Sequence, residues 1–175
     1  MNLEYSPGRP EDLFGKKARL LVAQMTYPEL LGFLQQHRTS IQVEEDLRDI
    51  GKRICTKLLE LWNPKAKTIM GLTKELMKVL WNGKIAFKIL ERDAYKRPTQ
   101  VLFIDKDCKL CKSEGEIVEA EGVHYCAAVS GFIETLLNAQ KGTMKLSYTT
   151  VKVKTISSRA SGDKECIHSC EFMYE

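Results

Sequence analysis

Hydrophobic positions in the first half of the chain recur with the period of an α-helix. Their intervals of three and four residues form one apolar stripe and predict an amphipathic helix from about Ile41 to Trp62. The stripe consists of Val43, Leu47, Ile50, Ile54, Leu58 and Leu61. Asn63-Pro64 ends the helix, because a residue before proline disfavours helical backbone angles.

Two more helices flank this one. Thr26 and Glu29 form a capping-box pattern that predicts a helix from Tyr27 to about His37. A third apolar stripe begins at Ile69 and ends at Trp81-Asn82-Gly83, where Gly83 is suited to a left-handed cap.

The hydrophobic period then changes to two. The alternation from Ile85 to Ile89 and the apolar run from Val101 to Ile104 predict an antiparallel hairpin. A polar, irregular stretch from Asp105 to Gly122 leads to a fourth helix from about Val123 to Ala139. Small residues near its start, Ala127, Ala128, Ser130 and Gly131, allow another element to approach closely.

The last part of the chain is strand-like. Alternation from Met144 to Tyr148 changes phase at Thr149-Thr150 before a run from Val151 to Thr155, which predicts a bulge or bend. A turn over Ser157 to Asp163 and a final strand from Glu165 to Tyr174 follow. The predicted order is three helices, a hairpin, a helix and a second hairpin.

Length and composition fit one globular domain. The chain has 175 residues, of which 43% are hydrophobic. We expect a flexible tail over residues 1–13 and a single domain over residues 14–175. No secretory signal and no run of about 18 apolar residues is present, so we expect a cytoplasmic protein, at most peripheral to a membrane. The net charge of +4 is too mild to indicate nucleic-acid binding.

The sequence carries no enzyme signature. Phosphate-binding glycine loops, zinc-protease helices and serine-hydrolase elbows are missing, so we expect a protein that is not an enzyme. Four of its six cysteines have CxxC or CxxxC spacing, which favours a metal or free thiols in a reducing compartment over disulfides.

The cysteines predict a structural zinc site. Cys108 and Cys111 have the knuckle spacing that brings two thiolates to one tetrahedral ion, and Cys166 and Cys170 supply a second pair. In a strand the latter two lie about 13 Å apart, so only a bulge would bring them to one ion. Cys126 is the expected replacement for one of the four. The alternative interpretation is a set of free, buried thiols.

Two further surfaces are candidate binding surfaces. Met70, Met77, Val79 and Trp81 widen the apolar arc of the third helix, which predicts oligomerisation through helices. Lys152 and neighbouring lysines form either a solvated strand face or a weak contact with anionic lipid headgroups.

Several short strings resemble the small core subunits of the TRAPP vesicle-tethering complex, the Bet-type family. They include Tyr125 to Glu134 at the fourth helix, Leu47 to Arg53 in the second and Val79 to Trp81 in the third. The likeness covers about Met25 to Ile156. It implies a mixed α/β (α+β) fold, with helices packed on one side of a twisted antiparallel sheet of about four strands.

The chain departs from that family in two places. Its end, Ala160 to Phe172, resembles the closing hairpin of the four-vinyl-reductase domain, a prokaryotic ligand-binding domain with some zinc-binding members. The dual likeness suggests a prokaryotic or archaeal relative. The acylated TRAPP subunit carries a cysteine ahead of the third helix, whereas Asn63 to Gly71 has none, so thioester acylation is not expected here.

The resemblance implies a role in assembly. The leading hypothesis is a non-enzymatic scaffold subunit that forms homo- or hetero-oligomers with related small subunits and acts in vesicle tethering or small-GTPase regulation. The alternative is a small-ligand or zinc-binding sensor of the four-vinyl-reductase type.

Overall fold

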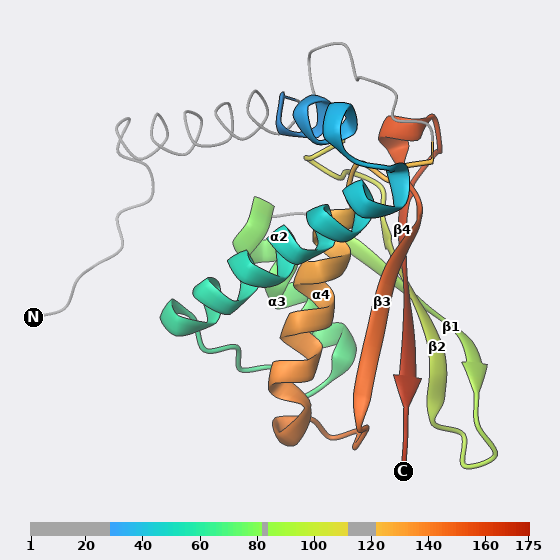
Figure 1. Ribbon diagram of the computed structural model, residues 1–175. Helices are drawn as coiled ribbons and strands as arrows, with labels where there is room; N and C mark the ends of the chain where they lie inside the picture. Colours follow the sequence, from blue (N-terminus) through green and yellow to red (C-terminus); the bar gives the residue numbers. More distant parts are fainter. Residues whose placement is uncertain (1–28, 82–83, 112–121) are drawn as a thin grey trace, which may run out of the picture.

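The computed structural model describes residues 29–81, 84–111 and 122–175 (Figure 1). The predicted tail, the start of the first helix at Tyr27 and the cap at Gly83 lie outside these residues. Residues 29–37 are helical. The other elements are α2 (Ser40–Leu61), α3 (Ile69–Trp81), β1 (Ile85–Arg92), β2 (Pro98–Asp105), α4 (Ala127–Gln140), η1 (Lys141–Thr143), β3 (Thr150–Ser157), η2 (Arg159–Ser161) and β4 (Cys166–Met173).

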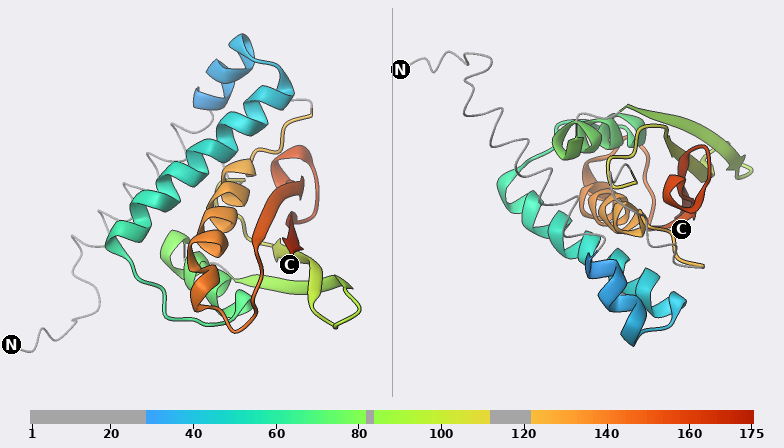
Figure 2. Two further views of the ribbon diagram at one scale, coloured as in Figure 1. Left: turned by 60° about the horizontal axis from the view of Figure 1, so that its bottom comes forward. Right: turned by 90° about the horizontal axis from the view of Figure 1, so that it is seen from above.

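The four strands form one antiparallel sheet in the order β1-β2-β4-β3. Figures 1 and 2 show the helices on one side of this sheet, with α4 packed between α2 and β3. The prediction of a mixed α+β fold with helices on one side of an antiparallel sheet is therefore confirmed.

Helix α2 forms where the apolar stripe predicted it, but only part of that stripe is buried, since Ile54 and Leu61 are 50% and 90% exposed. Val43, Leu47 and Cys55 are buried on the face turned toward the core. The helix starts where Thr39 accepts a hydrogen bond from the Gln42 amide while the Gln42 side chain accepts one from Thr39, a reciprocal capping box. The predicted bounds were correct to within one residue at each end.

The predicted start of the fourth helix was wrong by four residues. Helix α4 begins at Ala127, with Cys126 at its N-cap, and not at Val123. The Ala127 amide donates to the His124 carbonyl at 2.9 Å, a tight turn that precedes the helix. This turn fixes the position of Cys126.

The predicted strand from Met144 to Tyr148 was also wrong, because β3 begins only at Thr150. The segment is held as a loop: the Lys145 amide donates to the Lys67 carbonyl at 3.0 Å, and the Tyr148 hydroxyl donates to the Leu137 carbonyl at 2.6 Å. The change of phase therefore marks the start of a strand and not a bulge within one.

The apolar arc of α3 is narrower than predicted. Met70 and Val79 are 44% and 45% exposed, but Met77 is fully buried in the core. The structure does not describe the side chain of Trp81. Among the described helices, none is long and apolar enough to cross a membrane.

Candidate metal centre

Four cysteine side chains meet inside the protein. The sulfur atoms of Cys108, Cys111, Cys126 and Cys166 all lie within 4.8 Å of one another. Three of these residues have no exposed surface, and Cys111 is 7% exposed. They come from three segments: the turn after β2, the N-cap of α4 and the first residue of β4.

The sheet topology brings these segments together. Antiparallel pairing places Asp105, the last residue of β2, opposite Cys166, the first residue of β4. The chain then turns at once, since the Asp107 amide donates to the Asp105 carboxylate at 2.9 Å. Cys108 and Cys111 therefore lie at the same end of the sheet as Cys166, and α4 begins at this end as well (Figure 1).

Two groups of the β3–β4 connection also contact the sulfur atoms. The Arg159 amide donates to Cys166 Sγ at 3.4 Å, and the Ser158 hydroxyl lies 3.5 Å from Cys111 Sγ. Cys111 Sγ and Cys166 Sγ are 3.4 Å apart. Such polar contacts suit sulfur atoms that carry negative charge.

The pKa values of these thiols shift in opposite directions. Hydrogen bonds from Cys108, then Cys126 and Cys166, hold the pKa of the Cys111 thiol well below its usual range. The hydrogen bond with Cys111 is the largest cause that raises the pKa of Cys108. The hydrogen bond with Cys108 is the largest cause that raises the pKa of Cys126. A lowered pKa at Cys111 favours the thiolate, which is the form of cysteine that binds metals.

The spacing suits a tetrahedral metal ion. Zinc–sulfur bonds of about 2.3 Å place the four sulfur atoms of a tetrahedron about 3.8 Å apart. The observed separations, from the 3.4 Å of one pair up to the 4.8 Å limit, span that value. These four buried cysteines could hold a metal ion, and four thiolates would leave no open position for a substrate.

Three of the predicted ligands lie in this group, and the fourth does not. Cys108, Cys111 and Cys166 come together, whereas the group contains Cys126, the named replacement, and not Cys170. Cys170 is four residues further along β4, which pairs with β2 without a bulge, so about 13 Å of extended chain separates it from Cys166. It is a buried core residue, and desolvation raises the pKa of its thiol well above the usual value.

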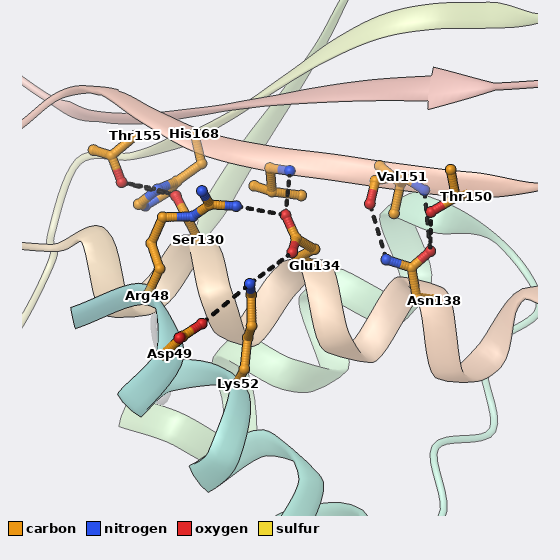
Figure 3. Close-up of polar contacts among 11 residues, drawn as sticks. Arg48, Asp49, Lys52, Ser130, Glu134, Asn138, Thr150, Val151, Thr155 and His168 are labelled. Atoms are coloured by element: carbon orange, nitrogen blue, oxygen red, sulfur yellow. Dashed lines mark hydrogen bonds and ion pairs between the residues drawn. The ribbon is translucent and has the colours of Figure 1, made fainter. Parts of the chain in front are cut away.

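The histidines lie outside the cysteine group. His124 Nδ1 lies 3.1 Å from the Glu44 carboxylate, and the ring of His37 packs on Phe33. His168 is fully buried, with Nδ1 3.0 Å from Ser130 Oγ and 3.1 Å from Thr155 Oγ1 (Figure 3). Sequence periodicity gave no sign of this buried polar triad.

A second polar group joins the layers at Glu134. Its carboxylate pairs with Arg48 at 2.7 Å and Lys52 at 3.3 Å, both on α2 (Figure 3). It also accepts the Val153 amide of β3 at 2.8 Å. Four residues later, Asn138 exchanges hydrogen bonds with the backbone N–H and C=O of Val151 at 3.0 and 2.9 Å. The free edge of β3 is thus covered by side chains of α4.

Comparison with solved structures identifies the fold. Subunit 3 of the trafficking protein particle complex from Naegleria fowleri, covalently bound to palmitic acid, superposes with a TM-score of 0.68 over 89% of this chain and 96% of that chain, at 13% identity. The chain has a TRAPP-subunit fold. No protein-family model and no curated protein matches its sequence.

A second structure shares the TRAPP-like fold at lower similarity. It is the phenol-responsive sensory domain of the transcription activator PoxR with phenol, with a TM-score of 0.58 and 12% identity over 85% of this chain and 74% of that chain. At these identities the likeness concerns the fold alone. The four-vinyl-reductase likeness and the archaeal origin stay predictions.

Proposed function

We propose that the chain is a non-enzymatic assembly subunit of the TRAPP type, which binds related small subunits through its helical layer. The observation that carries this proposal is the set of exposed apolar side chains on the described helices of a TRAPP-subunit fold. Ile41 and Leu61 are 74% and 90% exposed on α2. The other exposed apolar side chains of the layer are Leu30, Phe33, Ile54, Met70 and Val79.

Several exposed apolar side chains on one layer fit a surface that a partner covers. We therefore place the partner on the helical layer. The oligomer is either a homodimer or a heterodimer with a related small subunit. It acts in vesicle tethering or small-GTPase regulation in the cytoplasm.

The oligomeric state tests this proposal. Light scattering of the full chain at tens of micromolar should give a dimer, and Val79→Lys should shift it to monomer. Leu90→Lys is the matched control, because Leu90 on β1 has nearly the same exposure, 44%, but lies outside the helical layer. A monomer at that concentration would exclude a stable homodimer. Failure to bind any related subunit would then exclude the assembly role.

We propose further that Cys108, Cys111, Cys126 and Cys166 hold one structural zinc ion, with Cys126 in the place first given to Cys170. The ion would join the turn after β2 to the N-terminus of α4 and the start of β4, and its binding energy would add to folding stability. Elemental analysis of protein purified under reducing conditions should find one zinc per chain.

Variants separate ligands from other buried cysteines. Cys111→Ser and Cys126→Ser should each lower the zinc content and the melting temperature. Cys170→Ser, at a buried cysteine outside the group, should keep the zinc. Protein without zinc, with an unchanged melting temperature after Cys111→Ser, would overturn the proposal.

A second candidate function is a small-ligand sensor, which the fold similarity to the PoxR sensory domain favours. Native mass spectrometry of the purified full chain distinguishes the two. A bound small molecule beside the metal supports a sensor, whereas a ligand-free dimer supports an assembly subunit.

Contact with a membrane surface is a minor part of the proposal. Lys152 and Lys154 are exposed on the face of β3 turned away from α4, and Lys154 lies 3.5 Å from Glu171. Each lysine near an anionic surface adds about 1 kcal/mol at most. Flotation with anionic but not neutral vesicles, lost at high salt, would support the contact.

A further inference from the structure

The cysteine centre contains two sulfur atoms placed to react with each other. Cys111 Sγ and Cys166 Sγ are 3.4 Å apart, although 55 residues separate them in the chain. A disulfide bond is about 2.05 Å long, so the two atoms need to approach by little more than about 1 Å.

We propose that Cys111 and Cys166 are an oxidation-sensitive pair: a peroxide converts them to a disulfide, and the bound metal ion is released. The release of metal rests on the proposed zinc site, whereas formation of the disulfide depends only on the two sulfur atoms.

Exposure decides which sulfur reacts first. Cys111 is 7% exposed, while Cys108, Cys126 and Cys166 have no exposed surface. A small oxidant such as hydrogen peroxide therefore reaches Cys111 before the other three. Because Cys111 lies in a turn beyond the end of β2, its movement toward Cys166 breaks no strand pairing.

The reaction balances with peroxide as the oxidant. The Cys111 thiolate attacks one peroxide oxygen, the O–O bond breaks, and a sulfenic acid and a hydroxide ion form. The Cys166 thiolate then attacks the Cys111 sulfur, the S–O bond breaks, and a second hydroxide leaves as the disulfide forms. The two sulfur atoms lose two electrons in all, and the peroxide gains them.

The disulfide removes two ligands from the metal site but keeps two of the three segments of the site joined. Only Cys108 and Cys126 remain as thiols, and two ligands do not complete the four-coordinate shell of a structural zinc. The turn after β2 remains joined to β4 by the new covalent bond. We therefore expect oxidised protein that is folded and free of metal.

The test is titration of the metal-loaded full chain with hydrogen peroxide. A zinc-sensitive dye should report one zinc released per disulfide, the circular dichroism should stay unchanged, and dithiothreitol with added zinc should restore the metal. Trypsin cleavage without reduction should link the peptide Leu110 to Lys112, which carries Cys111, to the peptide Glu165 to Glu175.

One variant makes the peptide map unambiguous. Cys166 and Cys170 lie in the same last tryptic peptide, so wild-type protein does not show which of them is bonded to Cys111. If the Cys170→Ser variant still gives the cross-linked peptides, the disulfide partner of Cys111 is Cys166. Trypsin cuts after Lys109 and so separates Cys108 from Cys111. A link between Cys108 and Cys111, or oxidation without any link, would overturn the inference.

The outcomes separate this inference from the zinc proposal. Protein purified without zinc overturns the zinc site and the release of metal, and the peptide map of the same protein still decides the thiol pair. Zinc-containing protein that resists peroxide, or that loses zinc without the Cys111–Cys166 link, overturns only the inference made here.

Discussion

Gly51 of α2 lies directly against the carbonyl group of Ala128 in α4. The relationship is reciprocal, because Gly131 of α4 lies against the carbonyl group of Arg48 in α2. A Cβ atom at either glycine would overlap the backbone of the facing helix. The two helices therefore touch backbone to backbone, and this close crossing holds α2 on α4, the helix that carries Cys126 at its start.

Alanine at either position should push the helices apart. We expect Gly51→Ala and Gly131→Ala each to lower the free energy of unfolding by about 2 to 3 kcal/mol, the usual cost of an overpacked core. Urea denaturation measures this change. In the helical control Gly32→Ala, where the added Cβ meets nothing within 4 Å, stability should be unchanged or rise by up to about 1 kcal/mol. Equal effects at all three glycines would contradict the close crossing.

Glu134 should stabilise the fold more than a surface acid does. Its side chain is 14% exposed, forms ion pairs with two cations of α2 and accepts a hydrogen bond from one amide of β3. Glu134→Gln removes the charge that offsets partly buried Arg48 and should cost about 2 kcal/mol of unfolding free energy.

The control for Glu134 is an exposed ion pair. Glu60→Gln, which removes the partner of Lys57 on the surface of α2, should change stability by less than about 0.5 kcal/mol. Denaturation curves in which both substitutions cost the same would contradict a special role for Glu134.

Buried His168 should make the fold sensitive to mild acid. Desolvation lowers its pKa to about 4 from the ordinary 6.5. Between these values the unfolded chain binds the proton and the folded chain does not, so stability falls as the pH drops from 6.5 toward 4, by up to about 3 kcal/mol.

His168→Gln should remove this part of the pH dependence. The measurement is the slope of unfolding free energy against pH from 4 to 6.5, compared between wild type and variant at equal zinc content. Equal slopes in wild type and variant would show that protonation of His168 does not lower the stability of the folded protein.

The pair of His124 and Glu44 should make stability depend on pH in the opposite direction from His168. The hydrogen bond to Glu44, the largest cause, raises the pKa of His124 in the folded state. Its stabilisation is therefore complete below the unfolded pKa of about 6.5 and is lost as the pH rises through the raised folded value. Since both side chains are partly exposed, we expect no more than about 1 kcal/mol.

Glu44→Gln tests this pair. The variant should be less stable than wild type at pH 5.5 and equally stable at pH 8.5, measured by urea denaturation at both values. A difference that grows with pH would reverse the assigned sign.

The sequence alone determined the order of elements and most helix and strand positions. The apolar stripe of α2 and the alternation in β1 are local patterns, and they predicted the type and position of both elements, although only Val43 and Leu47 of the stripe are fully buried. The small residues at the start of α4 correctly predicted the close approach that Gly131 makes to α2. Local pattern failed from Met144 to Tyr148, where hydrogen bonds to Lys67 and Leu137 hold the alternating residues as a loop.

Only the tertiary structure decided which cysteines meet. The CxxC spacing of Cys108 and Cys111 is local and visible in the sequence. Whether Cys126 or Cys170 joins them depends on the antiparallel register of β2 and β4 and on the end of the sheet at which α4 begins. These are contacts between segments far apart in the chain, and residue spacing along the sequence does not encode them.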